Sequence, residues 1–185
     1  MIGAVSTLPV NWHAGPGTAL VVDGMLVPRD VLVFDLDGVL ADAAHRQHFL
    51  HLAEPDWEGF YAGVQADAPL ASGSALAAAT HPDLPIVILT GRIDGVAAVT
   101  IDWLQAHAVR WDLLICRPPD DSDAVTHAVD YKRTEVHRLR EAGLRPVLAV
   151  DDNRRIVEMY EELGIPALYL PSGYYDNSAR YDGGV

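Results

Sequence analysis

The stretch Val31–Leu40, with the sequence VLVFDLDGVL, decides the fold of this chain. Its first four residues are apolar and include two β-branched valines, a pattern typical of a strand that is buried on both faces of a parallel sheet. Asp35 and Asp37 follow where such a strand leaves the sheet, which is the usual ligand position in open α/β sheets. Two carboxylates placed this close repel each other and lose hydration, so the pattern favours a bound cation. The alternative from this stretch alone is an ordinary Asp-Gly turn.

The composition limits what can be built on that strand. At 185 residues, half of them apolar, the chain fits one domain with a full core and a small insertion. The formal net charge of −13 argues against broad electrostatic adhesion to nucleic acid or to an anionic membrane, although a local basic cluster remains compatible with it. Cys116 is the only cysteine, which excludes an internal disulfide and any cysteine-based zinc site and suits a reducing cytoplasm. There is neither an 18-residue apolar run nor a basic leader, so we expect a soluble cytoplasmic protein without a membrane partner.

The first 30 residues are expected to form a separate unit before a core of residues 31–185. Residues 1–17 contain several prolines and glycines and predict an irregular arm. Apolar residues at 18–22 and 25–27 flank Asp23-Gly24, a strong signal for a two-residue β-hairpin.

Between the first strand and the next apolar strand, the chain is longer than a crossover helix requires. Helical segments are predicted at 43–52, 55–64 and 72–79, and we expect an insertion at about 42–80 to form a small helical cap over the strand end.

The cap carries three histidines and three aromatic residues. A metal site at the histidines is possible, but the favoured interpretation is a partly exposed face, with Arg46 and His48 directed toward substrate. The aromatics are expected to form the interior of the cap and not a base-stacking platform. The residues concerned are His45, His48, His51, Trp57, Phe60 and Tyr61.

Further apolar segments alternate with helical ones along the rest of the chain. Strands are predicted at 86–89, 112–116, 146–150 and 165–170, and helices at 95–108, 131–142 and 154–163. Together with the first strand, this pattern predicts an α/β fold, a doubly wound Rossmann-like parallel sheet with right-handed crossovers.

Unusual polar residues fall at or just beyond the ends of these strands. Because the carboxyl ends of parallel strands share one crevice, we expect these side chains to meet. Thr90-Gly91-Arg92 can hold a phosphate, and Lys132 lies in a helical first turn, where the dipole disfavours a cation. An oxygen-rich cage suited to Mg²⁺ would be formed by Asp35, Asp37, Asp151 and Asp152, and the phosphate would be ringed by Thr90, Arg92 and Lys132. Residues 120–123 are interpreted as a solvated acidic loop.

Four segments resemble, in order, the motifs of the haloacid dehalogenase superfamily of phosphohydrolases. They are FDLDGVL at 34–40, LTGR at 89–92, Lys132 and VDD at 150–152. Residues 150–160 and PSGYY at 171–175 further resemble the 3′-phosphatase domain of bacterial and phage polynucleotide kinase/phosphatases. Val39 departs from the threonine of many members, and the sequence has no P-loop, so the kinase half is not expected.

The resemblance implies roles for the polar residues. Asp35 would be the nucleophile that forms an aspartyl-phosphate, and Asp37 would be the general acid and base. Mg²⁺ would be held by Asp35, the backbone carbonyl of Asp37 and the Asp151/Asp152 pair. Thr90 and Lys132 would hold phosphate oxygens. The expected substrate-binding residues are Arg46, Thr90, Gly91, Arg92 and Arg117.

The sequence thus predicts a Mg²⁺-dependent phosphomonoester hydrolase for a nucleotide or a nucleic-acid 3′-terminal phosphate, with a separate kinase or ligase as a possible partner. One alternative is a 5′(3′)-deoxyribonucleotidase, since residues 37–42 also resemble that family, and another is a small-molecule phosphatase of the superfamily. A non-catalytic phosphate-binding module is a third alternative, but a mere binder needs no proton shuttle at Asp37.

Overall fold

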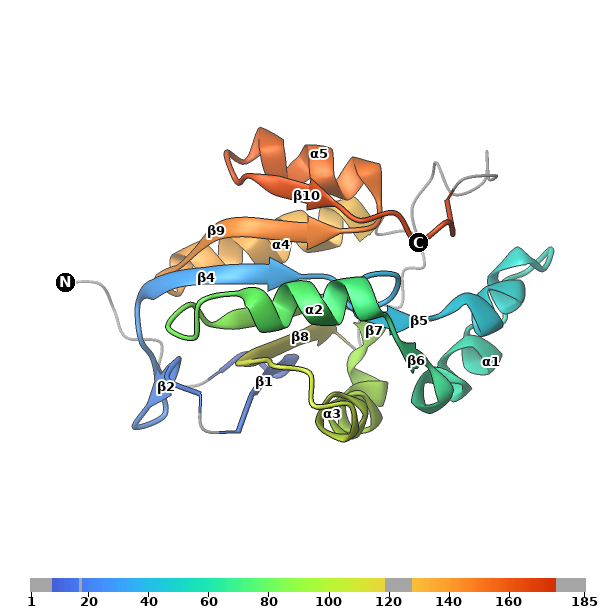
Figure 1. Cartoon of the computed structure of the whole chain (residues 1–185), viewed down its shortest axis with the longest axis horizontal. Helices are drawn as coiled ribbons and strands as arrows, with labels where there is room; N and C mark the ends of the chain where they lie inside the picture. Colours follow the sequence, from blue (N-terminus) through green and yellow to red (C-terminus); the bar gives the residue numbers. More distant parts are fainter. Residues whose placement is uncertain (1–7, 17, 119–127, 176–185) are drawn as a thin grey trace.

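The computed structural model describes residues 8–16, 18–118 and 128–175. Its centre is a six-stranded sheet in the order β1-β8-β7-β4-β9-β10 (Figure 1). The five strands β8, β7, β4, β9 and β10 run parallel, and β1 pairs antiparallel with β8 at one edge. In sheet order the bounds are β1 Trp12–Ala14, β8 Leu113–Arg117, β7 Ile86–Ile93, β4 Arg29–Phe34, β9 Leu144–Asp151 and β10 Ala167–Tyr169.

Helices cover the two faces of this sheet. Alternate residues of β4 face opposite ways: Val31 and Val33 pack in the cluster that contains α4 and α5, and Leu32 and Phe34 in the cluster that contains α2 and α3. A strand with apolar neighbours on both faces must be apolar throughout, which accounts for the unbroken run in the sequence. The expected doubly wound α/β sheet is therefore confirmed. The helices are α2 Ala71–Ala79, α3 Ala97–Ala106, α4 Ala128–Glu141 and α5 Arg154–Glu162.

The N-terminal segment differs from the irregular arm expected at 1–17. Within its described part, Trp12–Ala14 forms β1 and joins the sheet. The indole of Trp12 is buried, and its Nε1 donates a hydrogen bond to Glu135 Oε2 at 2.8 Å. Three residues between a proline and a glycine give no periodic signal, so this strand depends on contacts with distant residues.

The predicted hairpin is present, although its arms are short. β2 Val21–Val22 pairs with β3 Met25–Leu26. Asp23 and Gly24 have φ angles of 52° and 76°. This left-handed backbone is what a tight two-residue hairpin turn requires.

The cap begins and ends on a two-stranded stem that the sequence analysis did not predict. β5 Ala41–Asp42 pairs antiparallel with β6 Ala68–Pro69. Three helical segments lie between them: η1 Ala44–His51, a 3₁₀ helix within the helical segment predicted at 43–52, α1 Trp57–Ala62, and the 3₁₀ helix η2 Val64–Ala66. Figure 1 shows the cap at the end of the molecule toward which the arrows of β4 and β9 point.

The structure also bears on three other expectations from the sequence: the position of Lys132, the lack of a membrane span and the acidic loop at 120–123. Lys132 lies in the second turn of α4, because this helix begins at Ala128 and not at residue 131. No helix in the described part of the chain is long and apolar enough to cross a membrane. The expected acidic loop at 120–123 lies outside the described residues.

Candidate active site

Three buried carboxylates meet at the ends of the neighbouring strands β4 and β9. Asp35, Asp151 and Asp152 each place one oxygen within 4.8 Å of the others. Lys132 reaches this cluster from α4, with its Nζ 3.0 Å from Asp35 Oδ1 and 2.7 Å from Asp151 Oδ2. One ammonium group cannot balance three carboxylates in a buried site, so the cluster retains an excess of negative charge.

The Asp152 carboxylate is buried without good hydrogen-bond donors among the described residues. Neither of its carboxylate oxygens accepts a hydrogen bond of normal geometry within the described part of the chain. Burial and the charges of Asp35 and Asp151 raise its pKa well above the usual value, and the nearby Ser172 hydroxyl opposes this only in part. A Cβ at Gly38 would lie 2.0 Å from Asp152 Oδ2, so a glycine is needed there. Unsatisfied buried oxygens fit a hard divalent cation, which takes oxygen ligands.

The pKa of Asp35 is also raised. Burial raises its pKa to about 7, with Lys132 opposing the shift and the Asp151 carboxylate adding to it. A carboxylate whose pKa is higher in the folded than in the unfolded protein binds a proton more tightly when folded. Its contribution to stability is therefore present at low pH and is lost as the pH rises between the two values.

We expect the metal-free protein to become less stable as the pH rises from about 4 to about 7, by up to about 1.4 kcal/mol per pH unit for each such group. Thermal unfolding in EDTA across this range measures the effect, and Asp35→Asn should flatten the profile. Asp102→Asn is the matched control, because Asp102 is exposed. An unchanged profile in Asp35→Asn would show that this carboxylate is not the source.

Asp37 does not join the carboxylate cluster through its side chain. Its Oδ1 is 2.7 Å from Arg46 Nη2, and Arg92 donates to the same carboxylate through Nε, at 3.1 Å, and through Nη2. Burial alone would raise the pKa of Asp37, but Arg92 and Arg46 outweigh it and hold the pKa below its usual value. The expected cage of four carboxylates is therefore a cluster of three in this structure, because Asp37 neutralises two buried arginines instead.

Asp67 is a residue of this site that the sequence analysis missed. Its fully buried carboxylate accepts hydrogen bonds from Arg46 Nε and Nη2 at 2.9 and 2.8 Å and from Arg92 Nη2 at 2.6 Å, and lies 2.8 Å from His45 Nε2. The two arginines and the two aspartates form a charge-balanced network between the cap and the core. Nothing near Asp67 in the sequence resembles a motif, so only proximity reveals it.

The phosphate-binding candidates on β7 lie beside this network. Thr90 is buried, and its Oγ1 accepts a hydrogen bond from the backbone N–H of Arg92 at 3.2 Å. A Cβ at Gly91 would meet nothing within 4 Å, so this backbone borders open space. The hydroxyl of Tyr61 donates to the Gly91 carbonyl at 3.4 Å, which places the cap against this part of β7. Arg117 ends β8, with its guanidinium 5.1 Å from the centre of the Tyr131 ring.

The three aromatic residues of the cap pack together in its interior, as expected, whereas Arg46 is fully buried and does not lie on a partly exposed face. Phe60 is buried, with Trp57 and Tyr61 packed against it and Arg46 lying 4.1 Å over its ring. Among the described residues, no group of potential metal ligands includes any of the three cap histidines.

Comparisons with known proteins agree with this architecture. The family described as the polynucleotide kinase PNKP phosphatase domain matches residues 29–175. A chain of the Pnkp1/Rnl/Hen1 RNA repair complex superposes with a TM-score of 0.60 at 19% identity, over 77% of this chain and 42% of that one. The class C acid phosphatase from Bacillus anthracis with tungstate bound gives a TM-score of 0.54 at 14% identity, over 80% of this chain and 69% of that one.

These structures share the fold with this chain at low identity, and the chain spans less than half of the chains that it matches in the Pnkp1/Rnl/Hen1 complexes. No protein of curated function matches the sequence significantly. Phosphatases of the haloacid dehalogenase superfamily generally use a divalent metal, and the carboxylate cluster fits one. The family match extends from the first residue of β4 to Tyr175, so it contains all four of the motifs found in the sequence. The chain therefore belongs to the PNKP phosphatase-domain family of the haloacid dehalogenase superfamily.

Proposed function

We propose that this protein is a Mg²⁺-dependent phosphomonoesterase that acts through an aspartyl-phosphate on the 3′-terminal phosphate of a nucleotide or nucleic acid. The position of Asp35 carries the proposal. Its buried carboxylate leaves the end of β4 next to Lys132 and beside the Asp151/Asp152 pair, in a family of phosphatases.

The first chemical step transfers the phosphoryl group to the protein. An oxygen of Asp35 forms a bond to phosphorus while the bond from phosphorus to the ester oxygen breaks, and Asp37 donates a proton to the departing alcohol. In the second step Asp37 takes a proton from water, the resulting hydroxide attacks phosphorus, and the bond to Asp35 breaks to release phosphate.

Other side chains stabilise the negative charge of the phosphate during these steps. Lys132 and Thr90 bind phosphate oxygens, the former being held in place by Asp151. Asp35, Asp151, Asp152 and the backbone carbonyl of Asp37 would hold Mg²⁺. The bound ion would offset the repulsion between the carboxylate and the phosphate.

The ion pairs of Asp37 suggest how one residue serves as both acid and base. Arg46 and Arg92 hold Asp37 as a carboxylate, the form that accepts a proton from water. A substrate phosphate competes for these two guanidinium groups. When the two arginines turn to the phosphate, Asp37 loses its ion pairs and its pKa rises, because burial then dominates. Asp37 can therefore carry the proton that the first step needs.

The cap and the net charge together favour a short contact with the substrate. The cap is only a 3₁₀ helix, one short α-helix and a turn, so the site should admit a chain end. The charge of −13 repels a longer polyanion. We therefore propose that only the last one or two nucleotides are bound, with Arg117 near the terminal phosphate.

A separate kinase or ligase would supply the other activities of end repair, as suggested by the likeness to a chain of an RNA repair complex.

A substrate panel tests this assignment. With Mg²⁺ present, we expect kcat/KM to be highest for a 3′-phosphorylated oligonucleotide, compared with its 5′-phosphorylated counterpart and with 3′- and 5′-mononucleotides. Because few phosphates are contacted, log KM should rise with log salt concentration with a slope of about 1 to 2.

Other outcomes of the substrate panel would support a different function. A strong preference for 5′-mononucleotides would transfer the assignment to a 5′(3′)-deoxyribonucleotidase, the alternative that residues 37–42 suggest. Preference for a sugar phosphate would exclude both, and phosphate binding without turnover would leave only a binding module.

A further inference from the structure

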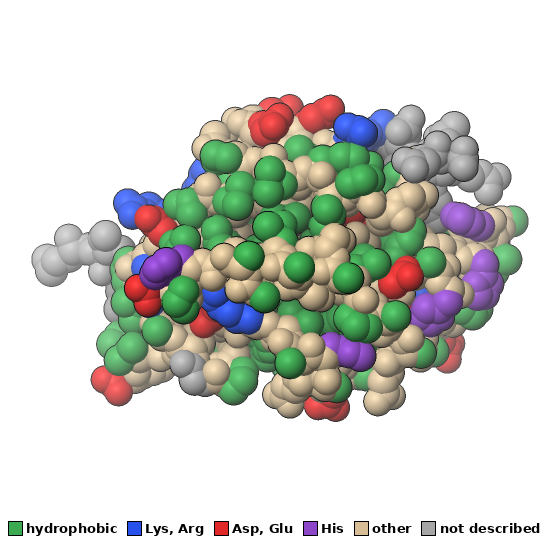
Figure 2. All heavy atoms as spheres, in the orientation of Figure 1, with side chains coloured by type: hydrophobic (Ala, Val, Ile, Leu, Met, Phe, Trp, Pro, Cys, Tyr) green, Lys and Arg blue, Asp and Glu red, His purple; other side chains and the backbone are tan. Residues whose placement is uncertain are grey.

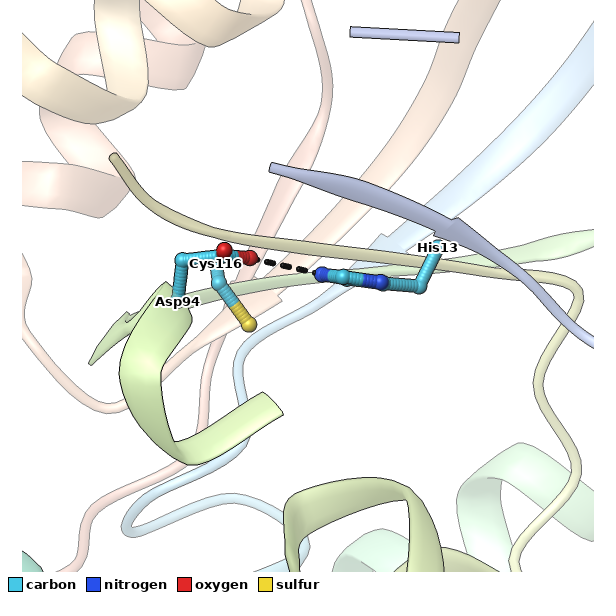
Figure 3. Close-up of side chains that lie close together, drawn as sticks. All are labelled: His13, Asp94 and Cys116. Atoms are coloured by element: carbon cyan, nitrogen blue, oxygen red, sulfur yellow. Dashed lines mark hydrogen bonds and ion pairs between the residues drawn. The ribbon is translucent and has the colours of Figure 1, made fainter. Parts of the chain in front are cut away.

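A second group of potential metal ligands lies outside the proposed active site. The side chains of His13, Asp94 and Cys116 come from β1, from η3 Asp94–Val96 and from β8, and they converge on one point (Figure 3). One potential ligand atom from each lies within 4.8 Å of the other two. His13 Nε2 is 2.7 Å from Asp94 Oδ1.

The pairing of β1 with β8 brings these residues together. His13 lies opposite Leu114 in the antiparallel register. Cys116 is two residues further along β8, so its side chain emerges on the same face of the sheet. Two hydrogen bonds hold β8 beside the start of β1 at this point: Cys116 N donates to the Asn11 carbonyl at 3.0 Å, and the side-chain Nδ2 of Asn11 donates to the Cys116 carbonyl at 2.8 Å.

The cluster is closed on one side and open on the other. Cys116 is fully buried, whereas the side chains of His13 and Asp94 are 27% and 20% exposed. An ion could therefore enter past His13 and Asp94, and water could occupy the remaining coordination position. Without an ion, the group is a hydrogen-bonded His–Asp pair over a core cysteine.

The donor set and the local charge favour one class of ion. Imidazole, thiolate and carboxylate together suit Zn²⁺, whereas Mg²⁺ and Ca²⁺ prefer oxygen alone. One Zn²⁺ with a thiolate, a carboxylate and a neutral imidazole has no net charge, which lowers the cost of burying it. Arg92, the nearby cation, is already paired with Asp37 and Asp67.

We propose that His13, Asp94 and Cys116 form a Zn²⁺ site that ties β1 to the ends of β7 and β8. The exclusion of a cysteine-based zinc site from the single cysteine holds only for sites with several cysteines, because a mixed site needs only one. His13 precedes the segment matched by the family, so part of the site belongs to the N-terminal strand of this chain. Burial raises the pKa of the Cys116 thiol to about 12, so metal binding must displace its proton and should tighten with increasing pH.

Co²⁺ is the probe for this site, since it replaces Zn²⁺ and is visible by absorption. We expect the protein, without a histidine tag, to bind one Co²⁺ with a near-ultraviolet cobalt–thiolate band that Zn²⁺ abolishes. Because the chain has one cysteine, such a band identifies Cys116. The band should disappear in Cys116→Ser, and Co²⁺ affinity should fall at least about tenfold in His13→Ala.

Three controls make the result decisive. His137→Ala, at an exposed histidine, and Asp152→Asn, in the other carboxylate cluster, should both retain the band. If Cys116→Ser fails to fold, His13→Ala and Asp94→Asn carry the test, because both side chains are partly exposed. In the Asp152→Asn background, a Zn²⁺ concentration about 100 times Kd should raise Tm by about 5 to 10 °C, and His13→Ala should remove this rise.

The proposal is overturned if no cobalt–thiolate band appears up to millimolar Co²⁺, or if His13→Ala and Asp94→Asn bind Co²⁺ as tightly as the unmodified chain. These readouts do not depend on phosphatase activity, so they are independent of the proposed substrate and mechanism.

Discussion

Asp35→Asn is expected to lower turnover by at least about 10⁴-fold, because an amide cannot serve as the nucleophile that accepts the phosphoryl group. The fold should persist. Asparagine has nearly the same volume, its amide oxygen can still accept the hydrogen bond that Leu36 N donates at 2.8 Å, and Lys132 keeps its ion pair with Asp151. The measurement is kcat with a 3′-phosphorylated oligonucleotide, together with circular dichroism and Tm.

A second variant separates the roles of the two aspartates. Asp37→Asn should lose at least about 10²-fold in turnover, because general acid and base help is removed from both steps. Acid quenching during turnover should reveal a phospho-enzyme that forms and decays slowly in this variant and is absent from Asp35→Asn. Substantial turnover in Asp35→Asn, with Asp102→Asn as the control for fold and charge, would exclude the covalent mechanism at this residue.

Removal of divalent metal is expected to have a comparably large effect. Three buried carboxylates face one lysine, and an incoming phosphate adds further negative charge to the site. Without a cation, repulsion should prevent productive binding, so exhaustive chelation with EDTA should abolish activity and Mg²⁺ should restore it. Ca²⁺ should inhibit, because its larger and more flexible coordination shell misplaces the nucleophile relative to the phosphate.

The metal dependence can be assigned to the proposed residues. Asp152→Asn should raise the Mg²⁺ concentration needed for half-maximal activity, since Asp152 offers two oxygens that accept no hydrogen bond of normal geometry from the described residues. His13→Ala should leave that concentration unchanged, because the cluster on β1 is separate. Full activity after exhaustive chelation would be incompatible with the metal role that we propose for the carboxylates.

The charged side chains on the visible face do not form a large patch of one sign. Figure 2 shows acidic and basic side chains scattered over this face, with several histidines at the cap end, and no broad basic band that would suit an extended nucleic-acid groove on the side shown. A footprint of one or two nucleotides is consistent with that distribution.

The sequence by itself determined the five parallel strands, the helices that cover them and the edge of the sheet at which the site lies. Apolar runs such as Val31–Phe34 predict strands because a doubly covered strand must be apolar on both faces, and this signal is local. Polar residues that end such runs, including Asp35, Thr90 and Asp151, must gather at one edge because parallel strands share a direction. Local patterns were therefore enough for the fold class and for the location of the site.

The tertiary structure alone decided which of these charges pair. Asp37 joins Arg46 and Arg92 and not the carboxylate cluster, and Asp67 enters the site although nothing in its neighbouring sequence marks it. β1 likewise depends on distant partners, and with it the juxtaposition of His13 with Cys116. Such contacts join residues far apart in the sequence. Their energy depends on distance and burial after folding, and neither quantity is encoded in a local pattern of residue types.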